Sequence, residues 1–103
     1  MFQDHVYILC KKIPKGRVST YGEIAHALGC KAYRAVGHAL RKNPDFPNTP
    51  CFRVVASGGK IGGFNGETQG KEIQRKIKLL EQEGLKIKNN KILNFEEVLY
   101  HFE

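Results

Sequence analysis

Apolar residues recur at helical spacing in three segments of the chain, which predicts three amphipathic helices. The first covers residues 2–13 and ends before Pro14. The second runs from about Lys31 to Lys42, and the third from about Lys71 to Glu83. Gly84 follows the third helix as its expected C-terminal cap. The chain is therefore predicted to be mainly helical.

A shorter helix is predicted between the first two. Thr20 precedes Glu23 by three residues, which is the spacing of a capping box, and the helix would run to about Leu28 with Gly29 as its stop. The predicted helix of residues 31–42 follows at once. The two helices around Gly29 therefore form a candidate helix-turn-helix, in which the second helix is the one that meets DNA.

The segment after Cys51 has the β-branched residues and glycines of short strands. Phe52 to Val55 is predicted as a strand, residues 57–59 as a turn and residues 60–61 as a return strand. Further on, the pattern predicts an edge strand at residues 85–88, a turn at residues 89–90 and a short helix in residues 95–102. The expected fold is a small, mostly helical α+β domain, winged-helix-like, with a β-hairpin beside the Cys51 loop.

Length and composition narrow the class of protein. The 103 residues, 41% hydrophobic and 26% charged, predict a single globular domain over residues 1–103. Neither a secretory signal nor a window apolar enough for a membrane span is seen, so we expect an intracellular protein without membrane association. Three cysteines without paired spacing and four scattered histidines predict reduced thiols, no metal and no cofactor.

The charge favours a polyanionic partner. Seventeen basic against ten acidic residues give a net charge of +7. Part of this charge lies on the predicted helix of residues 31–42, where small residues leave Arg34 projecting from a low surface. Arg34 is also explained as an ordinary solvated charge, and Gly37 as a point of close helix packing; both alternatives stay open.

Cys51 follows a proline-rich run in which Pro50 fixes the backbone directly before the thiol. This is a rigid mounting for a nucleophile, although a free cysteine is often just a small buried residue. The glycines around Phe64 suggest close approach of the backbone. Because this loop lacks the lysine spacing of a P-loop, a base-sized pocket beside Cys51 fits it better than a phosphate cradle.

These motifs resemble the O6-alkylguanine-DNA alkyltransferases, specifically their C-terminal DNA-binding and active-site domain. The resemblance runs from roughly Tyr7 to Gly84. Six segments carry it in the family's order and spacing: residues 13–16, 18–25, 34–37, 43–44, 50–55 and 79–84.

The resemblance implies a role for each matching residue. Cys51 takes the alkyl group, the Tyr21 hydroxyl assists guanine departure, Glu83 belongs to a relay that activates the thiol, and Arg34 enters the base stack when the damaged base leaves it. The recognition helix docks in the minor groove. The remaining matches are the hinge Asn43, the pocket positions Val54, Phe64, Asn65 and Gly66, and the DNA-contact positions Thr20, Ala32, Gly37, Arg41 and Ser57.

The sequence departs from the family at Phe52, which occupies the position of the histidine that links the cysteine to Glu83. We expect Arg53 or the helix termini to lower the pKa of Cys51 instead. Two functions stay open. One is a single-turnover DNA methyltransferase; the other is an alkyltransferase-like protein that binds alkylated guanine without repairing it and recruits other factors. A transcription regulator ranks below both. The expected partners of the monomer are duplex DNA with O6-alkylguanine and other repair proteins.

Overall fold

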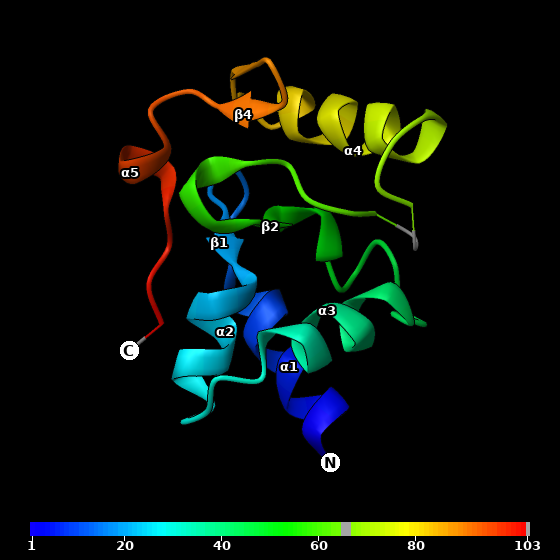
Figure 1. Cartoon of the computed structure of the whole chain (residues 1–103), viewed down its shortest axis with the longest axis vertical. Helices are drawn as coiled ribbons and strands as arrows, with labels where there is room; N and C mark the ends of the chain where they lie inside the picture. Colours follow the sequence, from blue (N-terminus) through cyan, green and yellow to red (C-terminus); the bar gives the residue numbers. More distant parts are fainter. Residues whose placement is uncertain (65–66, 103) are drawn as a thin grey trace.

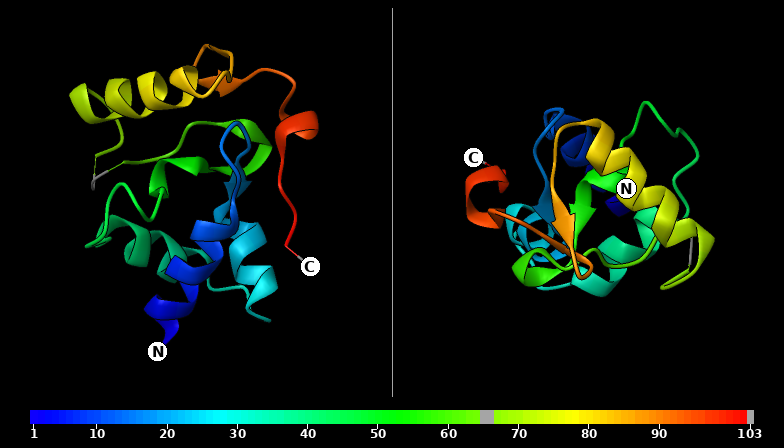
Figure 2. Two further views of the ribbon diagram at one scale, coloured as in Figure 1. Left: turned by 180° about the vertical axis from the view of Figure 1, so that it is seen from behind. Right: turned by 90° about the horizontal axis from the view of Figure 1, so that it is seen from above.

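The computed structural model describes residues 1–64 and 67–102. Helices α1 to α3 form the lower layer in Figure 1, α4 crosses the top, and the short strands β1 and β2 lie between them. Figure 2 shows the same order from behind and from above. The elements in chain order are α1 (Phe2–Lys12), β1 (Ser19–Thr20), α2 (Tyr21–Ala27), α3 (Tyr33–Arg41), the 3-10 turn η1 (Cys51–Arg53), β2 (Val54–Val55), the 3-10 turn η2 (Ser57–Gly59), α4 (Lys71–Gln82), β3 (Ile87–Lys88), β4 (Lys91–Ile92) and α5 (Phe95–Val98).

The helix-turn-helix predicted from the sequence is confirmed in α2 and α3. The Thr20 side chain accepts a hydrogen bond of 3.0 Å from the backbone N–H of Glu23 and so caps α2. After α2 the chain turns at Gly29, whose φ is +76°, and the N–H of Cys30 donates to the carbonyl of Ala25. Helix α3 begins at Tyr33, two residues later than expected.

The predicted strand Phe52–Val55 is wrong in its first half, and so is its pairing. Cys51–Arg53 is a 3-10 turn, because the Pro50 carbonyl accepts the N–H of Arg53 and curls the chain. Only Val54–Val55 is a strand. It pairs in parallel with β1 and not in a hairpin with residues 60–61, and both valines are fully buried, as parallel strands require.

The C-terminal segment closes the sheet region from the side. Strands β3 and β4 form a hairpin through Asn89 and Asn90, both at positive φ, which confirms the predicted turn. The predicted helix of residues 95–102 covers only Phe95–Val98. Beyond it the chain is extended along Val18, whose N–H donates to the carbonyl of Val98 and whose carbonyl accepts the N–H of Tyr100.

A continuous hydrophobic core joins the helical layer to α4. Its fully or nearly fully buried members include Val6, Cys10, Ile24, Val36, Val54, Val55, Ile73 and Leu80. Within the described ranges, no helix combines the length and apolar character needed to cross a bilayer.

Gly59 is held against the C-terminal helix. A Cβ at this position would lie 2.9 Å from Cγ and 3.0 Å from Cβ of Phe95, and its φ is +88°. We expect Gly59→Ala to lower the free energy of unfolding by about 2 kcal/mol, from backbone strain plus the clash. Gly58→Ala is the matched control, because Gly58 has φ of +73° with nothing within 4 Å of a Cβ. Urea unfolding measures both; equal losses would leave only strain at Gly59.

Candidate active site

Cys51 begins the turn η1, directly after Pro50, and its side chain is 8% exposed. Its backbone N–H donates to the carbonyl of Thr49. Asn43, just past the end of α3, donates a 2.7 Å hydrogen bond to that same carbonyl and accepts one from the N–H of Asp45. The Asn43 side chain therefore ties the end of α3 to the loop that carries Cys51.

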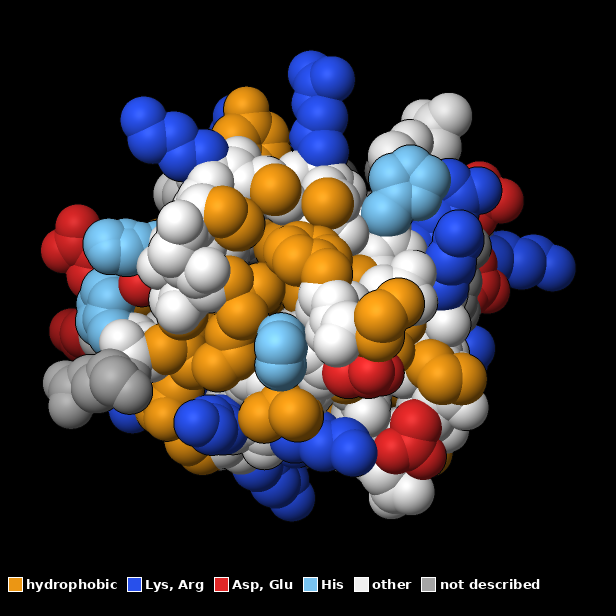
Figure 3. All heavy atoms as spheres, turned by 90° about the horizontal axis from the view of Figure 1, so that it is seen from below, with side chains coloured by type: hydrophobic (Ala, Val, Ile, Leu, Met, Phe, Trp, Pro, Cys, Tyr) orange, Lys and Arg blue, Asp and Glu red, His pale blue; other side chains and the backbone are white. Residues whose placement is uncertain are grey.

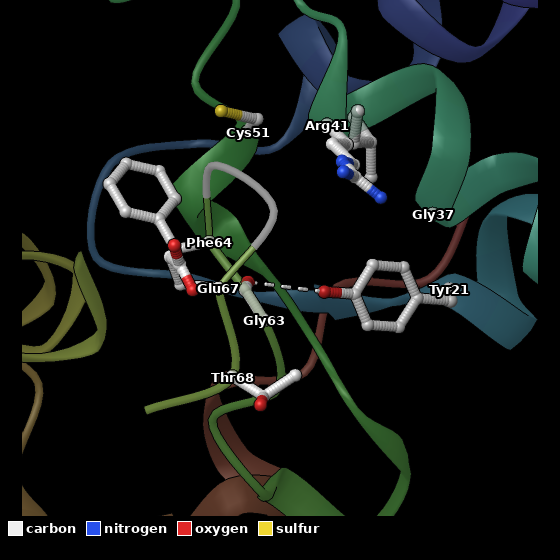
Figure 4. A pocket seen from close by; sticks show the side chains of 9 residues that line it. Tyr21, Gly37, Arg41, Cys51, Gly63, Phe64, Glu67 and Thr68 are labelled. Atoms are coloured by element: carbon white, nitrogen blue, oxygen red, sulfur yellow. Dashed lines mark hydrogen bonds between the residues drawn. The ribbon is translucent and has the colours of Figure 1, made fainter. Parts of the chain in front are cut away.

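A cavity of about 290 Å³ opens beside the thiol, which is at the small end of the range for ligand pockets. Figure 4 shows side chains from α2, α3 and the Gly63–Thr68 segment around it, together with Cys51. The lining residues are Tyr21, Gly37, Leu40, Arg41, Cys51, Gly63, Phe64, Glu67 and Thr68.

Tyr21 crosses the cavity from the first position of α2. Its hydroxyl donates a long hydrogen bond of 3.5 Å to the carbonyl of Gly63, drawn in Figure 4. Burial, together with the charge of Cys51, raises the pKa of Tyr21 to about 12. At neutral pH the hydroxyl is therefore protonated and can donate a proton or a hydrogen bond to a group in the cavity.

The thiol is buried among groups that oppose one another. Burial raises the pKa of Cys51, while a hydrogen bond from Asn43 and the positive charges of Lys76 and Arg75 lower it. Arg53 is not among these groups, contrary to the sequence-based expectation. The charge that faces Cys51 comes from helix α4.

Arg53 turns to Glu83, the candidate relay residue. Its Nη2 lies 2.6 Å from Oε2 and its Nε 2.9 Å from Oε1 of the carboxylate, and the two side chains are 17% and 9% exposed. Arg53 Nη1 donates to the carbonyl of Ile13, and the N–H of Gly16 donates to Glu83. This bidentate pair clamps η1 to the ends of α1 and α4.

Phe52 lies in an aromatic cluster and not in a polar relay. Its ring is 6% exposed and meets the edge of Phe46 at 6.2 Å, and the Arg53 guanidinium lies over it. Phe46 also meets Phe64 of the cavity, and Arg75 lies over both of these rings. The cluster forms an apolar support behind the thiol.

The other candidate site residues are scattered around this centre. Val54 is fully buried in β2 and does not line the cavity. Thr20 is occupied by capping α2. Asn65 and Gly66 lie outside the described residues. Ala32 and Arg34 are exposed at the start of α3, and Ser57 is exposed in η2.

Helix α3 lies on the lower face of the molecule. Figure 3 views this face and shows apolar side chains over its centre, with Lys, Arg and His side chains between and around them. Gly37 and Arg41 connect this helix to the cavity, since both line it. A partner bound along α3 would therefore reach the cavity directly.

Sequence reasoning missed Lys76, a fully buried lysine on α4. Its position is the signal that could have found it. In the spacing Ile73, Lys76, Ile77, Leu80, the lysine occupies a place on the apolar stripe of the helix.

Comparison with known proteins gives a consistent result. Residues 1–85 match the family described as 6-O-methylguanine DNA methyltransferase, DNA binding domain. The chain is 42% identical over 90 residues to a bifunctional methyltransferase/endonuclease of Picrophilus torridus, covering 86% of this chain and 28% of the relative. It is 45% identical over 86 residues to a methylated-DNA–protein-cysteine methyltransferase of Saccharolobus islandicus, covering 84% of this chain and 52% of the relative. This chain thus spans half or less of these two relatives.

A shorter relative and a solved structure match over most of their length. A DNA base-flipping protein of Vibrio parahaemolyticus is 40% identical over 87 residues, which is 84% of this chain and 82% of that protein. The crystal structure of S. pombe Atl1 in complex with damaged DNA containing O6-carboxymethylguanine has a TM-score of 0.80 at 32% identity, covering 98% of this chain and 95% of Atl1.

Proposed function

The chain belongs to the family of the 6-O-methylguanine DNA methyltransferase DNA-binding domain, and from this premise we propose that it repairs O6-alkylguanine in duplex DNA. Helix α3 docks in the minor groove, the damaged base turns out of the stack into the cavity, and Cys51 takes the alkyl group. The observation that carries the proposal is the cavity itself, which has the Cys51 thiol and the Tyr21 hydroxyl on its wall and α3 at its edge. Genomic DNA as substrate requires an intracellular location.

The reaction is a displacement at carbon. The Cys51 thiolate forms a bond to the alkyl carbon, the bond from that carbon to O6 breaks, and its electron pair stays on the guanine, which takes up a proton. Tyr21 is the proposed proton or hydrogen-bond donor to the departing base, since its hydroxyl stays protonated at neutral pH. Each protein molecule acts once, because the thioether is not reversed.

Flipping the base is needed because O6 is hidden in the stacked duplex. The proposed role of Arg34 is to fill the space that the base leaves. Arg41 and Gly37, at the edge of the cavity, are proposed to contact the DNA next to the flipped nucleotide. The net charge of +7 supports attraction to the phosphate backbone.

A second function, lesion binding without transfer, is favoured by one observation. Phe52 cannot accept a proton, and Glu83 is bound on both oxygens by Arg53, so no base within a relay activates Cys51. The similarity to S. pombe Atl1 over nearly the whole of both chains fits this reading as well. A protein of this kind would hold the flipped base and recruit other repair proteins.

Intact mass after incubation with duplex DNA containing O6-methylguanine separates the two functions. We expect the wild-type protein to gain one methyl group, and Cys51→Ser to gain none. Cys30→Ser is the matched control, because Cys30 is also a free cysteine but lies away from the cavity, in the turn between α2 and α3, and should still gain the methyl group. Tight lesion-selective binding of the wild type in a gel shift, with no change in mass, would establish the second function instead.

A further inference from the structure

Lys76 binds three carbonyl groups inside the protein. Its Nζ lies 2.8 Å from the carbonyl oxygen of Val54, 2.6 Å from that of Ile61 and 2.9 Å from that of Gly63. Val54 belongs to β2, two of these carbonyls precede the cavity residue Phe64, and the side chain is 0% exposed. One side chain thus ties helix α4 to the strand after Cys51 and to the segment that carries the cavity wall.

The number of acceptors favours the ammonium form of Lys76. An ammonium has three N–H donors, and three carbonyls accept them here. A neutral amine has only two donors, so one buried carbonyl would face its lone pair. Burial opposes this charge and lowers the pKa of Lys76 to about 7, and the charge of Cys51 raises it. A thiolate on Cys51 and an ammonium on Lys76 therefore stabilise each other.

The groups that face Cys51 differ in sign from element to element. Helix α1 contributes Tyr7 and Cys10, and α2 contributes Tyr21; each is acidic when it ionises and neutral at pH 7. Helix α4 contributes the two cations, Lys76 in the core and Arg75 at the surface. Lys76 is the buried one of the two, so its charge is the less screened by water.

We propose that Lys76 is a positioning residue for the Cys51 chemistry: it holds the cavity wall in place through three backbone carbonyls and supplies the buried positive charge that favours the thiolate in a chain with phenylalanine beside the cysteine. This inference rests on Cys51 being the proposed acceptor. It names the source of the thiolate, which the proposed function leaves open.

The rate of Cys51 alkylation by iodoacetamide, followed by intact mass from pH 6 to 10, tests the proposal without DNA. Cys10→Ser/Cys30→Ser protein restricts the reaction to Cys51 and serves as the background. We expect Lys76→Met to slow alkylation at pH 7 by at least about tenfold and to move the midpoint of the pH–rate profile to higher pH, because loss of a positive charge raises the pKa of the thiol. Lys78→Met, on the exposed face of the same helix, should leave the profile unchanged.

A purely structural role for Lys76 gives the opposite result. If its loss only loosens the cavity, Cys51 becomes more exposed, the burial that raises its pKa is relieved, and alkylation becomes faster at pH 7. That outcome, or an unchanged profile, would overturn the proposal. If Lys76→Met does not fold, Lys76→Arg takes its place: an arginine keeps the charge and should keep the midpoint, and a midpoint shifted upward in folded Lys76→Arg protein would also overturn it.

Methyl transfer from O6-methylguanine DNA is measured on the same variants. A shifted iodoacetamide profile with no methyl gain even by the wild type would uphold the role of Lys76 and reject transfer. Methyl gain by the wild type with an unshifted profile would uphold transfer and reject the role of Lys76.

Discussion

Glu83→Gln is expected to lower the free energy of unfolding by about 3 kcal/mol, which is a large part of the stability of a domain of this size. The reason is the partner that it leaves behind. Arg53 is 17% exposed and gives Nε and Nη2 to the two carboxylate oxygens of Glu83. A neutral amide cannot compensate the buried guanidinium charge, and it turns a second donor toward it. Urea unfolding followed by circular dichroism measures the loss.

Glu81→Gln is the matched control for this prediction. Glu81 lies on the exposed side of α4, two residues before Glu83, and its replacement should change the stability by less than about 0.5 kcal/mol. A similar small effect at Glu83 would mean that water, and not Glu83, balances the charge of Arg53. The clamp between η1 and the ends of α1 and α4 would then not contribute to stability.

The helices of this fold could be predicted because their signals are local. The capping pair Thr20 and Glu23, the stop at Gly29 and the Asn89–Asn90 turn are each set by the conformational preferences of a few neighbouring residues. The strand at Phe52–Val55 failed for the opposite reason. β-branched and aromatic residues favour a strand, but the turn that the Pro50 carbonyl closes decides the conformation of the first three residues of η1.

The cavity depends on a pairing that no local signal indicates. Strand β1 directly precedes Tyr21, and β2 directly follows the turn that Cys51 begins. Because Ser19 pairs with Val54 and Thr20 with Val55, the two strands bring the hydroxyl and the thiol to one cavity from positions 30 residues apart in the sequence. The resemblance to alkyltransferases assigned both residues correctly to one neighbourhood, whereas periodicity alone assigned them to separate elements.

Electrostatic partners were the least predictable part of the site. Arg53 is near Cys51 in sequence, which made it the expected source of positive charge, yet its guanidinium finds Glu83 across 30 positions. Lys76 is far from Cys51 in sequence and faces it in space. Long side chains choose partners by reach and burial, and sequence separation carries little information about either.

Arg34→Ala is expected to weaken binding to a duplex with O6-methylguanine by at least about tenfold, equal to about 1.4 kcal/mol. Arg34 is exposed in the first turn of α3 and makes no ion pair with any residue of the described ranges. It is thus free to enter the space of the extruded base, where it would offset part of the few kcal/mol of lost stacking. A single strand with the same lesion has no such space, so its binding should weaken much less. Fluorescence anisotropy on both oligonucleotides gives the ratio.

Lys31→Ala supplies the comparison that gives this ratio its meaning. Lys31 is exposed just before α3, and a lysine there acts on phosphates as a point charge. Its removal should weaken duplex and single strand by similar factors and reduce the salt dependence of both. If Arg34→Ala behaves in the same way, with equal losses on the two oligonucleotides, Arg34 contacts only the backbone, and the space left by the flipped base must be filled by another side chain or by collapse of the stack.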